Sequence, residues 1–240
     1  MVLITGAASG IGRETALRAA TEGADIAAIG LDRDDLDALV HQVRGMGRRA
    51  ARCVADVSDA AGITTAIDAL VTELGPLSVV HANAGILVHP TSLVDLDLDE
   101  WHRVLAVDLT GVMLTFRAAV SHFGPKGGVM LATGSSLAIR PGTGLLPYVV
   151  AKAGVHALAR SLALELAPRR IRVNVIAPGL TDTAMTRGVP GHIERQVTSV
   201  PLGELVEAGD VAALAVHLMT DDARSVTGSV FTIDGGRTAG

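Results

Sequence analysis

Short apolar runs alternate with longer amphipathic segments along this chain of 240 residues, and this alternation constrains its fold most. The runs are rich in Val, Ile and Leu and apolar at nearly every position, which is typical of strands buried on both faces. Repeated alternation of strand and helix requires right-handed crossovers and a parallel sheet. The sequence therefore predicts an α/β protein with a doubly wound, parallel seven-stranded sheet flanked by helices.

No linker interrupts this order, so we predict a single domain over residues 1–240. The expected strands are residues 1–5, 25–30, 49–54, 77–81, 127–132, 170–176 and 229–233. The expected helices are residues 11–22, 33–46, 59–74, 99–123, 148–167 and 208–219. Region 178–209 lacks clear periodicity and follows a strand. Ligands bind at the carboxyl ends of strands in such a sheet, so we predict a lid-like loop there rather than a passive connection.

The composition excludes several classes of protein. Hydrophobic residues make up 49% and charged residues 19% of the chain, which excludes a largely disordered protein. The net charge of -5 gives no basic surplus for binding nucleic acid. No apolar run has the length of a membrane span, and residues 1–6 lack a signal-peptide pattern, so no membrane partner is expected. The single cysteine, Cys53, fits a reducing compartment, and we expect a cytoplasmic protein without a metal site.

A glycine-rich turn with the spacing G-x-x-x-G-x-G follows the first strand and opens the first helix. Small residues let the backbone approach a pyrophosphate, and the helix start offers free N–H groups. The alternative is a tight strand-to-helix turn without a ligand. The residues expected to contact a dinucleotide here are Gly6, Ser9, Gly10, Ile11 and Gly12.

Further cofactor contacts are expected at the ends of the next three strands. Asp32 lies twenty residues after Gly12, close to the distance expected of a carboxylate that binds the adenosine ribose. Asp56 can bind the adenine edge or, alternatively, cap the helix at 59–74. The segment Asn83-Ala84-Gly85 is expected to lie beside the cofactor. The alternative interpretation is a simple turn without a ligand.

The only tyrosine, Tyr148, lies four residues before Lys152, one of only two lysines, so the two share a helix face. A phenol has a pKa of about 10 and is no base at neutral pH unaided. A neighbouring ammonium lowers that pKa, so the phenol can exchange a proton with a substrate oxygen. Ser135 lies just after the fifth predicted strand, where its hydroxyl can polarise the same oxygen.

These residues together resemble the short-chain dehydrogenase/reductase family, in its shorter, single-domain branch. The resemblance implies a Rossmann-like fold and an NAD(P)-dependent oxidoreductase that transfers hydride between nicotinamide and a ketone or secondary alcohol. Matching motifs cover nearly the whole chain. They are the T-G-x-x-x-G-I-G turn at 5–12, Asp56-Val57, Asn83-Ala84-Gly85, Ser135, the Y-x-x-x-K pair, Pro178-Gly179 with Thr183, and Asp234-Gly235-Gly236.

The resemblance also implies individual roles. Tyr148 would be the general acid in reduction and the general base in oxidation, and Lys152 would lower its pKa and hold the nicotinamide ribose. Ser135 would orient the carbonyl group. Members of the family are mostly homotetramers, some dimers, so a homo-oligomer is expected. The cofactor contacts that the resemblance adds are Val57, Tyr148, Lys152, Pro178, Gly179 and Thr183.

Two positions depart from the family pattern. Asp108 stands where the family usually has an Asn that supports a proton-relaying water. A carboxylate there can stabilise Lys152 as a cation, so we include Asp108 among the catalytic residues and expect an altered pH dependence rather than loss of activity. Gly30 stands where NAD-using members usually carry Asp. Asp32 is expected to substitute and favours NAD, whereas Arg33 leaves NADP possible.

The candidate substrate pocket is apolar, so the expected substrate is an uncharged, fairly apolar ketone or secondary alcohol. Two other functions stay open. One is a dinucleotide-binding regulator or scaffold with a weak or inactive site, and the other is an isomerase or dehydratase on the same fold. The pocket candidates are Leu87, Leu137, Leu145, Leu146, Met185 and Val189, with Arg140 and Arg187 as exceptions.

Overall fold

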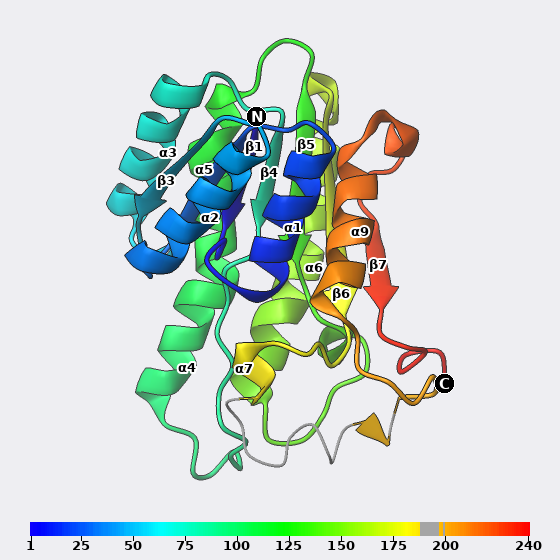
Figure 1. Ribbon diagram of the computed structural model, residues 1–240. Helices are drawn as coiled ribbons and strands as arrows, with labels where there is room; N and C mark the ends of the chain where they lie inside the picture. Colours follow the sequence, from blue (N-terminus) through cyan, green and yellow to red (C-terminus); the bar gives the residue numbers. More distant parts are fainter. Residues whose placement is uncertain (188–196, 199) are drawn as a thin grey trace.

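The central feature of the computed structural model, which describes residues 1–187, 197–198 and 200–240, is a seven-stranded parallel sheet (Figure 1). Its strand order is β3-β2-β1-β4-β5-β6-β7, and every neighbouring pair is parallel. The predicted doubly wound sheet is therefore confirmed. The strands are β1 (Val2–Thr5), β2 (Ile26–Gly30), β3 (Ala50–Val54), β4 (Val79–Ala82), β5 (Gly128–Thr133), β6 (Ile171–Pro178) and β7 (Val230–Ile233).

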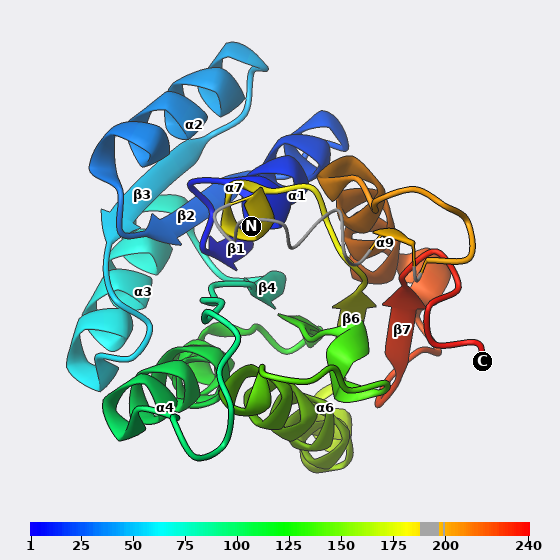
Figure 2. The ribbon, with the colours of Figure 1, turned by 90° about the horizontal axis from the view of Figure 1, so that it is seen from below.

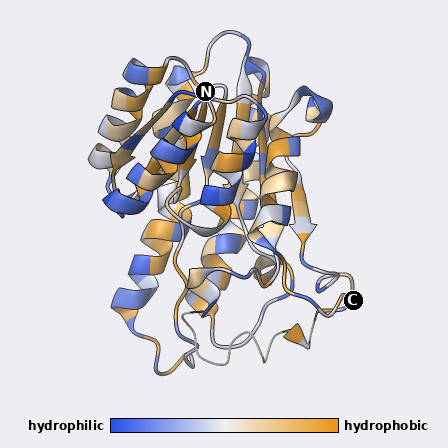
Figure 3. Cartoon of the chain, viewed as in Figure 1, coloured by the Kyte–Doolittle hydropathy of each residue, from blue (hydrophilic) through white to orange (hydrophobic). Residues whose placement is uncertain are grey.

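Helices cover both faces of the sheet (Figure 2). Hydrophobic cores form on both faces, because successive residues of a strand point to opposite faces. Leu3 faces the core under α3, α5 and α6, while Ile4 faces the core under α1 and α2. Strands are mostly hydrophobic and the outer helices are mixed (Figure 3). The helices are α1 (Gly10–Thr21), α2 (Arg33–Gly45), α3 (Ala60–Leu74), α4 (Leu98–Leu105), α5 (Gly111–Ala119), α6 (Leu146–Leu166), α7 (Ala184–Arg187) and α9 (Ala208–Met219).

The strand order reverses between β1 and β4, which places the ends of these strands beside each other. Leu3 pairs with Val80 in the register of the two strands, so the turn after β1 lies against the segment after β4. Gly6 has a φ of +64°, and a Cβ there would lie 2.8 Å from the Cα of Ala84. Only glycine fits this approach. The fold thus creates a crevice at the switch point, where ligands bind in such sheets.

The single helix predicted at 99–123 is divided in the structure. A π-helical turn, Ala106–Thr110, joins α4 to α5 and turns Asp108 fully inward. An 18-residue window of the continuous segment Leu98–His122 has a mean hydropathy of 1.5, so the segment matches a membrane span in length and composition alone. It packs within the fold instead, with α5 against α3 and the π-helical turn against α6.

The predicted lid-like loop lies only in part within the described residues. The helix α7 lies across the carboxyl ends of the central strands (Figures 1 and 2). Thr181 pairs with Val206 in an isolated bridge, which joins the two ends of the region. Residues 188–196 and 199 are outside the described part, so the lid itself stays a prediction.

Candidate active site

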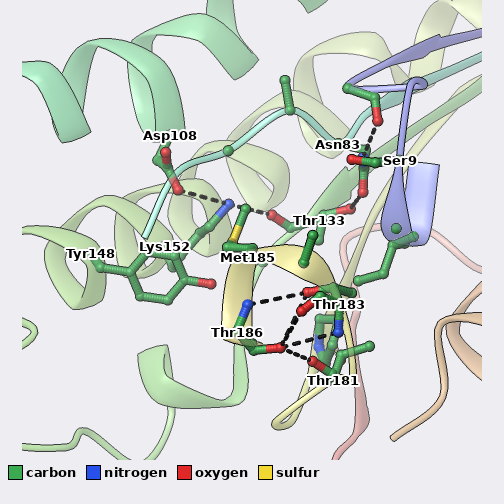
Figure 4. A pocket seen from close by; sticks show the side chains of 18 of the residues that line it. Ser9, Asn83, Asp108, Thr133, Tyr148, Lys152, Thr181, Thr183, Met185 and Thr186 are labelled. Atoms are coloured by element: carbon green, nitrogen blue, oxygen red, sulfur yellow. Dashed lines mark hydrogen bonds and ion pairs between the residues drawn. The ribbon is translucent and has the colours of Figure 1, made fainter. Parts of the chain in front are cut away.

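A cavity at the switch point gathers most of the predicted site residues (Figure 4). Its walls come from the β1–α1 turn, the segments after β4 and β5, the π-helical turn, α6, and the segment from the end of β6 into α7. The described lining residues are Gly6, Ser9, Gly10, Ile11, Asn83, Ala84, Gly85, Asp108, Thr133, Gly134, Tyr148, Lys152, Pro178, Gly179, Thr181, Thr183, Ala184, Met185 and Thr186.

The glycine-rich turn is shaped as a cradle for a ligand. Gly10 has a φ of +52°, and a Cβ there would come within 3.3 Å of the Thr183 side chain. Gly12 is not among the residues that line the cavity. It packs against the backbone oxygen of Gly6, and a Cβ on residue 12 would overlap that oxygen. These contacts fit the backbone approach that a dinucleotide needs at a helix start.

Asn83 holds the turn in place through its side chain. Its Nδ2 donates to the backbone oxygens of Thr5 and Gly6 at 3.2 and 3.3 Å, and its Oδ1 accepts from Thr133 Oγ1 at 2.9 Å. The amides of Asn83 and Ala84 both donate to Thr5 Oγ1. The segment therefore fixes three strand ends, in addition to facing the cavity as predicted.

Lys152 is buried at the centre of the site, between two acceptors (Figure 4). Its Nζ donates to the backbone oxygen of Thr133 at 3.0 Å and lies 3.3 Å from Asp108 Oδ2. Asp108 Oδ1 accepts from the amide of Ile86 at 2.8 Å. Burial is the largest single influence and lowers the pKa of Lys152, but the charges of Asp108 and Tyr148 and a hydrogen bond with Asp108 together raise the pKa overall. Lys152 is therefore held as a cation.

Burial also raises the pKa of Asp108, although Lys152 and the Ile86 amide pull it down. The pair is an ion pair without a well-aligned hydrogen bond at Oδ2. Gly85 packs closely beside it, because a Cβ there would lie 3.1 Å from Oδ2 and 3.3 Å from the lysine nitrogen and would push the pair aside. The carboxylate that replaces the usual amide is thus fully enclosed.

Tyr148 lies one turn before Lys152 on α6, with the lysine nitrogen 5.6 Å from its ring centre. Burial is the largest influence and raises the pKa of Tyr148. Lys152 and a hydrogen bond with Ser135 lower it, while Asp108 raises it further. As predicted, Lys152 acts to lower the pKa of Tyr148, but burial has the larger effect and the pKa is raised overall.

Ser135 is buried at the end of β5, where its Oγ accepts from the amide of Leu137 at 3.1 Å. The amide of Ser135 donates to His156 Nε2 at 3.5 Å. Burial lowers the pKa of His156 to about 4, so this ring is a neutral acceptor at pH 7. His156 therefore helps to position Ser135, a role that sequence reasoning missed because α6 brings the two together only in the fold.

A second cavity continues from the first toward β2 and β3. Asp32 caps α2 by accepting the amide of Asp35 at 2.9 Å. Asp56 accepts from Ser58, whereas Asp59 caps α3, so the alternative in which Asp56 caps that helix is wrong. Among the described lining residues none is cationic. They are Gly6, Ala8, Ser9, Ile29, Gly30, Leu31, Asp32, Asp35, Ala55, Asp56, Val57, Ala84, Gly85, Ile86 and Val107.

A third cavity lies on the other side of Tyr148. Of the expected pocket residues, Leu145 is buried behind it, Leu146 is 41% exposed to solvent, and Val189 lies outside the described residues. The sequence analysis did not include Arg237 among the site residues. The one sequence feature that could have pointed to it is its position directly after Asp234-Gly235-Gly236. The described lining residues are Leu87, Ser135, Ser136, Leu137, Tyr148, Gly179, Leu180, Met185, Thr186 and Arg237.

Comparison with known proteins agrees with this geometry. A family model described as enoyl-(acyl carrier protein) reductase matches residues 6–238. Cis-4-hydroxycyclohexanecarboxylate dehydrogenase of Sinomonas cyclohexanicum is 36% identical, over 100% of this chain and 96% of that protein. A short chain dehydrogenase of Burkholderia cenocepacia, solved in complex with NADP, superposes with a TM-score of 0.93 at 36% identity, covering 98% of this chain and 96% of that one.

A 3-ketoacyl-(acyl-carrier-protein) reductase of Brucella melitensis, complexed with NADH, superposes with a TM-score of 0.92 at 30% identity, covering 99% and 97% of the two chains. Fold, site and relatives define a nicotinamide-dependent oxidoreductase that acts on alcohols and ketones. The chain belongs to the short-chain dehydrogenase/reductase family, as its motifs predicted. Nothing in these comparisons supports the alternative of a regulator or scaffold.

Proposed function

We propose that the protein interconverts a secondary alcohol and a ketone on a largely apolar skeleton, with Tyr148 as the acid–base group. The observation that carries this proposal is that Tyr148 lines two cavities at once. One contains Lys152 and the glycine-rich turn, and the other contains Ser135 and the apolar side chains Leu137 and Leu180. A group shared by both can exchange a proton with substrate while hydride passes to or from the cofactor.

When bound, a nicotinamide cofactor would supply the hydride in reduction and accept it in oxidation. Tyr148 donates its hydroxyl proton to the carbonyl oxygen in reduction and takes it from the alcohol in oxidation. Lys152 stabilises the phenolate by its charge, and Ser135 holds the substrate oxygen. Asp108 is a positioning residue in this proposal, because it keeps Lys152 charged. The residues proposed to flank the nicotinamide are Pro178, Gly179 and Thr183.

NAD is the proposed cofactor in preference to NADP. The cavity toward β2 carries the carboxylates of Asp32, Asp35 and Asp56, and no described side chain that lines it is cationic. These charges repel a 2'-phosphate but can accept hydrogen bonds from ribose hydroxyls. Fluorescence titration with NADH and NADPH in one buffer tests the proposal. Tighter binding of NADH supports it, and tighter binding of NADPH contradicts it.

Cyclic secondary alcohols are the first substrates to test, because the Sinomonas relative carries hydroxycyclohexanecarboxylate in its name. The assay follows nicotinamide absorbance with NAD and a panel of cyclic and linear alcohols, and with NADH and the matching ketones. Product analysis separates oxidation from isomerisation and dehydration. Formation of an isomer or alkene without net change in the cofactor would refute an oxidoreductase.

We further propose a cytoplasmic homotetramer, or else a dimer. An oligomer is supported by large apolar side chains left exposed on one chain, such as Leu164 on α6 at 82% of its surface. Packing such side chains against a second copy of the chain would remove their apolar surface from water. Light scattering coupled to size-exclusion chromatography gives the state, and a mass equal to one chain would contradict this proposal.

A further inference from the structure

The substrate-side cavity contains one charged side chain among the described residues that line it. Ser135 and Tyr148 form its reactive end, and leucines and Met185 form most of the remaining wall. Ser136 and Thr186 add neutral polar groups, Arg237 adds the one charge, and no carboxylate among the described residues lines the cavity. A cation in a largely apolar pocket is the kind of polar group that fixes the orientation of a ligand.

The fold holds Arg237 at this cavity through the turn that ends the chain. Buried Asp234 accepts hydrogen bonds from the amide of Gly236 at 3.0 Å, and from the amide and hydroxyl of Thr238 at 3.0 and 2.7 Å. Gly236 has a φ of +89°, which favours glycine. The turn also packs on Gly179, whose Cβ would lie 2.7 Å from the Cα of Asp234. The hydrogen bonds to Asp234 therefore fix the turn, and the turn places Arg237 at the cavity.

The guanidinium of Arg237 uses a neutral partner. Its Nη1 donates to the backbone oxygen of Arg140 at 2.9 Å, and Arg140 Nη1 donates back to the oxygen of Arg237 at 2.7 Å. Within residues 1–187, 197–198 and 200–240, no carboxylate forms an ion pair with Arg237. Burial and the charge of Arg140 lower the pKa of Arg237, against a smaller opposite effect of Asp234. Two neighbouring cations thus have no matching anion among the residues that the structure describes.

Arg187 gives the contrast. Its guanidinium makes two hydrogen bonds of 2.6 Å with the carboxylate of Asp182, so its charge is already compensated. The sequence marked Arg140 and Arg187 as the cations to watch. In the structure Arg187 is paired, and Arg140 hydrogen-bonds with Arg237 but is not among the described residues that line the cavity. The uncompensated charge that reaches the substrate side belongs to Arg237.

We propose that Arg237 binds a carboxylate on the substrate, at the end remote from the reacting carbon. The substrate class is then a hydroxy acid or keto acid with an apolar skeleton between its two polar ends. A guanidinium offers a planar pair of N–H donors that matches a carboxylate. This inference rests on the proposed oxidoreductase function and replaces the expectation of an uncharged substrate.

The test compares charged and neutral forms of the same substrate. A graded series of linear and cyclic keto acids, each paired with its methyl ester, is reduced with NADH by the wild type. The variants are Arg237→Met, Arg237→Lys and, as a matched control, Arg187→Met, which removes the same charge from a guanidinium that is already paired. Binding of NADH to each variant is titrated separately.

The wild type is expected to prefer the best acid over its ester in kcat/KM by about 10- to 100-fold, the range of a hydrogen bond to a charged group. Arg237→Met should remove that preference by lowering kcat/KM for the acids about 10- to 100-fold, with a much smaller change for the esters and for the Kd of NADH. Arg237→Lys should keep part of it, and Arg187→Met all of it.

Three results would overturn the inference. Equal rates with acids and esters in the wild type would show that no anion is recognised, while leaving the oxidoreductase proposal standing. A loss of NADH affinity in Arg237→Met, without change in acid preference, would assign Arg237 to the cofactor phosphates instead. Turnover of neither series would overturn the proposed function and this inference together.

Discussion

Replacing Lys152 by Met tests whether Asp108 and Lys152 form a charged pair inside the protein. At 3.3 Å and an effective dielectric constant of 20, the attraction is about 5 kcal/mol before desolvation is subtracted. Desolvation offsets most of that gain, so the measurable quantity is the cost of leaving Asp108 buried without its partner. Met fills the space of the lysine stem and adds no charge.

The structure sets an upper limit on this cost, because an unpaired carboxyl can take up a proton. From the ordinary pKa of 3.8, protonation at pH 7 costs about 4.4 kcal/mol, and at pH 5 about 1.6 kcal/mol. We therefore expect Lys152→Met to lower the free energy of unfolding by about 3 kcal/mol at pH 7 and by much less at pH 5. The double variant Asp108→Asn with Lys152→Met should recover most of the loss, since Asn still accepts the Ile86 amide.

Urea denaturation at both pH values measures these differences, at one protomer concentration because the stability of an oligomer depends on it. Two results would refute the reasoning. One is a loss below about 1 kcal/mol at pH 7, far under the usual cost of breaking a buried pair. The other is an equal loss at pH 5 and pH 7, which would show that no carboxylate had been left to titrate.

Two further predictions follow from the cofactor cavity and the core. Leu31 is 68% exposed and lines the cofactor cavity beside Asp32. We expect Leu31→Arg to tighten the binding of NADPH about tenfold or more, measured by fluorescence titration, and to change the binding of NADH little. Unchanged binding of NADPH would contradict this prediction. Burial lowers the pKa of His81 to about 3, so folding favours its neutral ring, and this stabilisation is complete above pH 6.5 and lost as the pH falls. When the pH is lowered from 6.5 to 5, the free energy of unfolding should fall by about 2 kcal/mol less in His81→Gln than in the wild type. Urea denaturation measures both values, and an equal fall in the two proteins would refute the prediction.

The sequence was most informative where chemistry is local. Seven continuously apolar runs could be assigned to strands because burial on both faces leaves no polar alternation. The Tyr148 and Lys152 pair and the glycine-rich turn could be found because a helix turn or a strand end brings their residues together within a few positions. The structure places these groups around one cavity, with Ser135 beside Tyr148.

What escaped prediction depends on contacts between distant parts of the chain. The π-helical turn at Asp108 packs against α6 and accepts a hydrogen bond from the amide of Ile86. The helical periodicity of the sequence cannot predict either contact. Arg237 lies far from Tyr148 in sequence and joins it only through the turn at Asp234. The net rise in the pKa of Tyr148 depends on burial, which sequence spacing cannot supply.

The most direct test of the central claim is Tyr148→Phe, measured for both turnover and cofactor binding. Loss of the hydroxyl should lower kcat for the best alcohol by about 10²–10⁴-fold, the usual contribution of a general acid–base group. The Kd of NADH should remain that of the wild type, because the glycine-rich turn and Lys152 are untouched. A variant that retains wild-type turnover would contradict the role of Tyr148 and, with it, the mechanism proposed for this site.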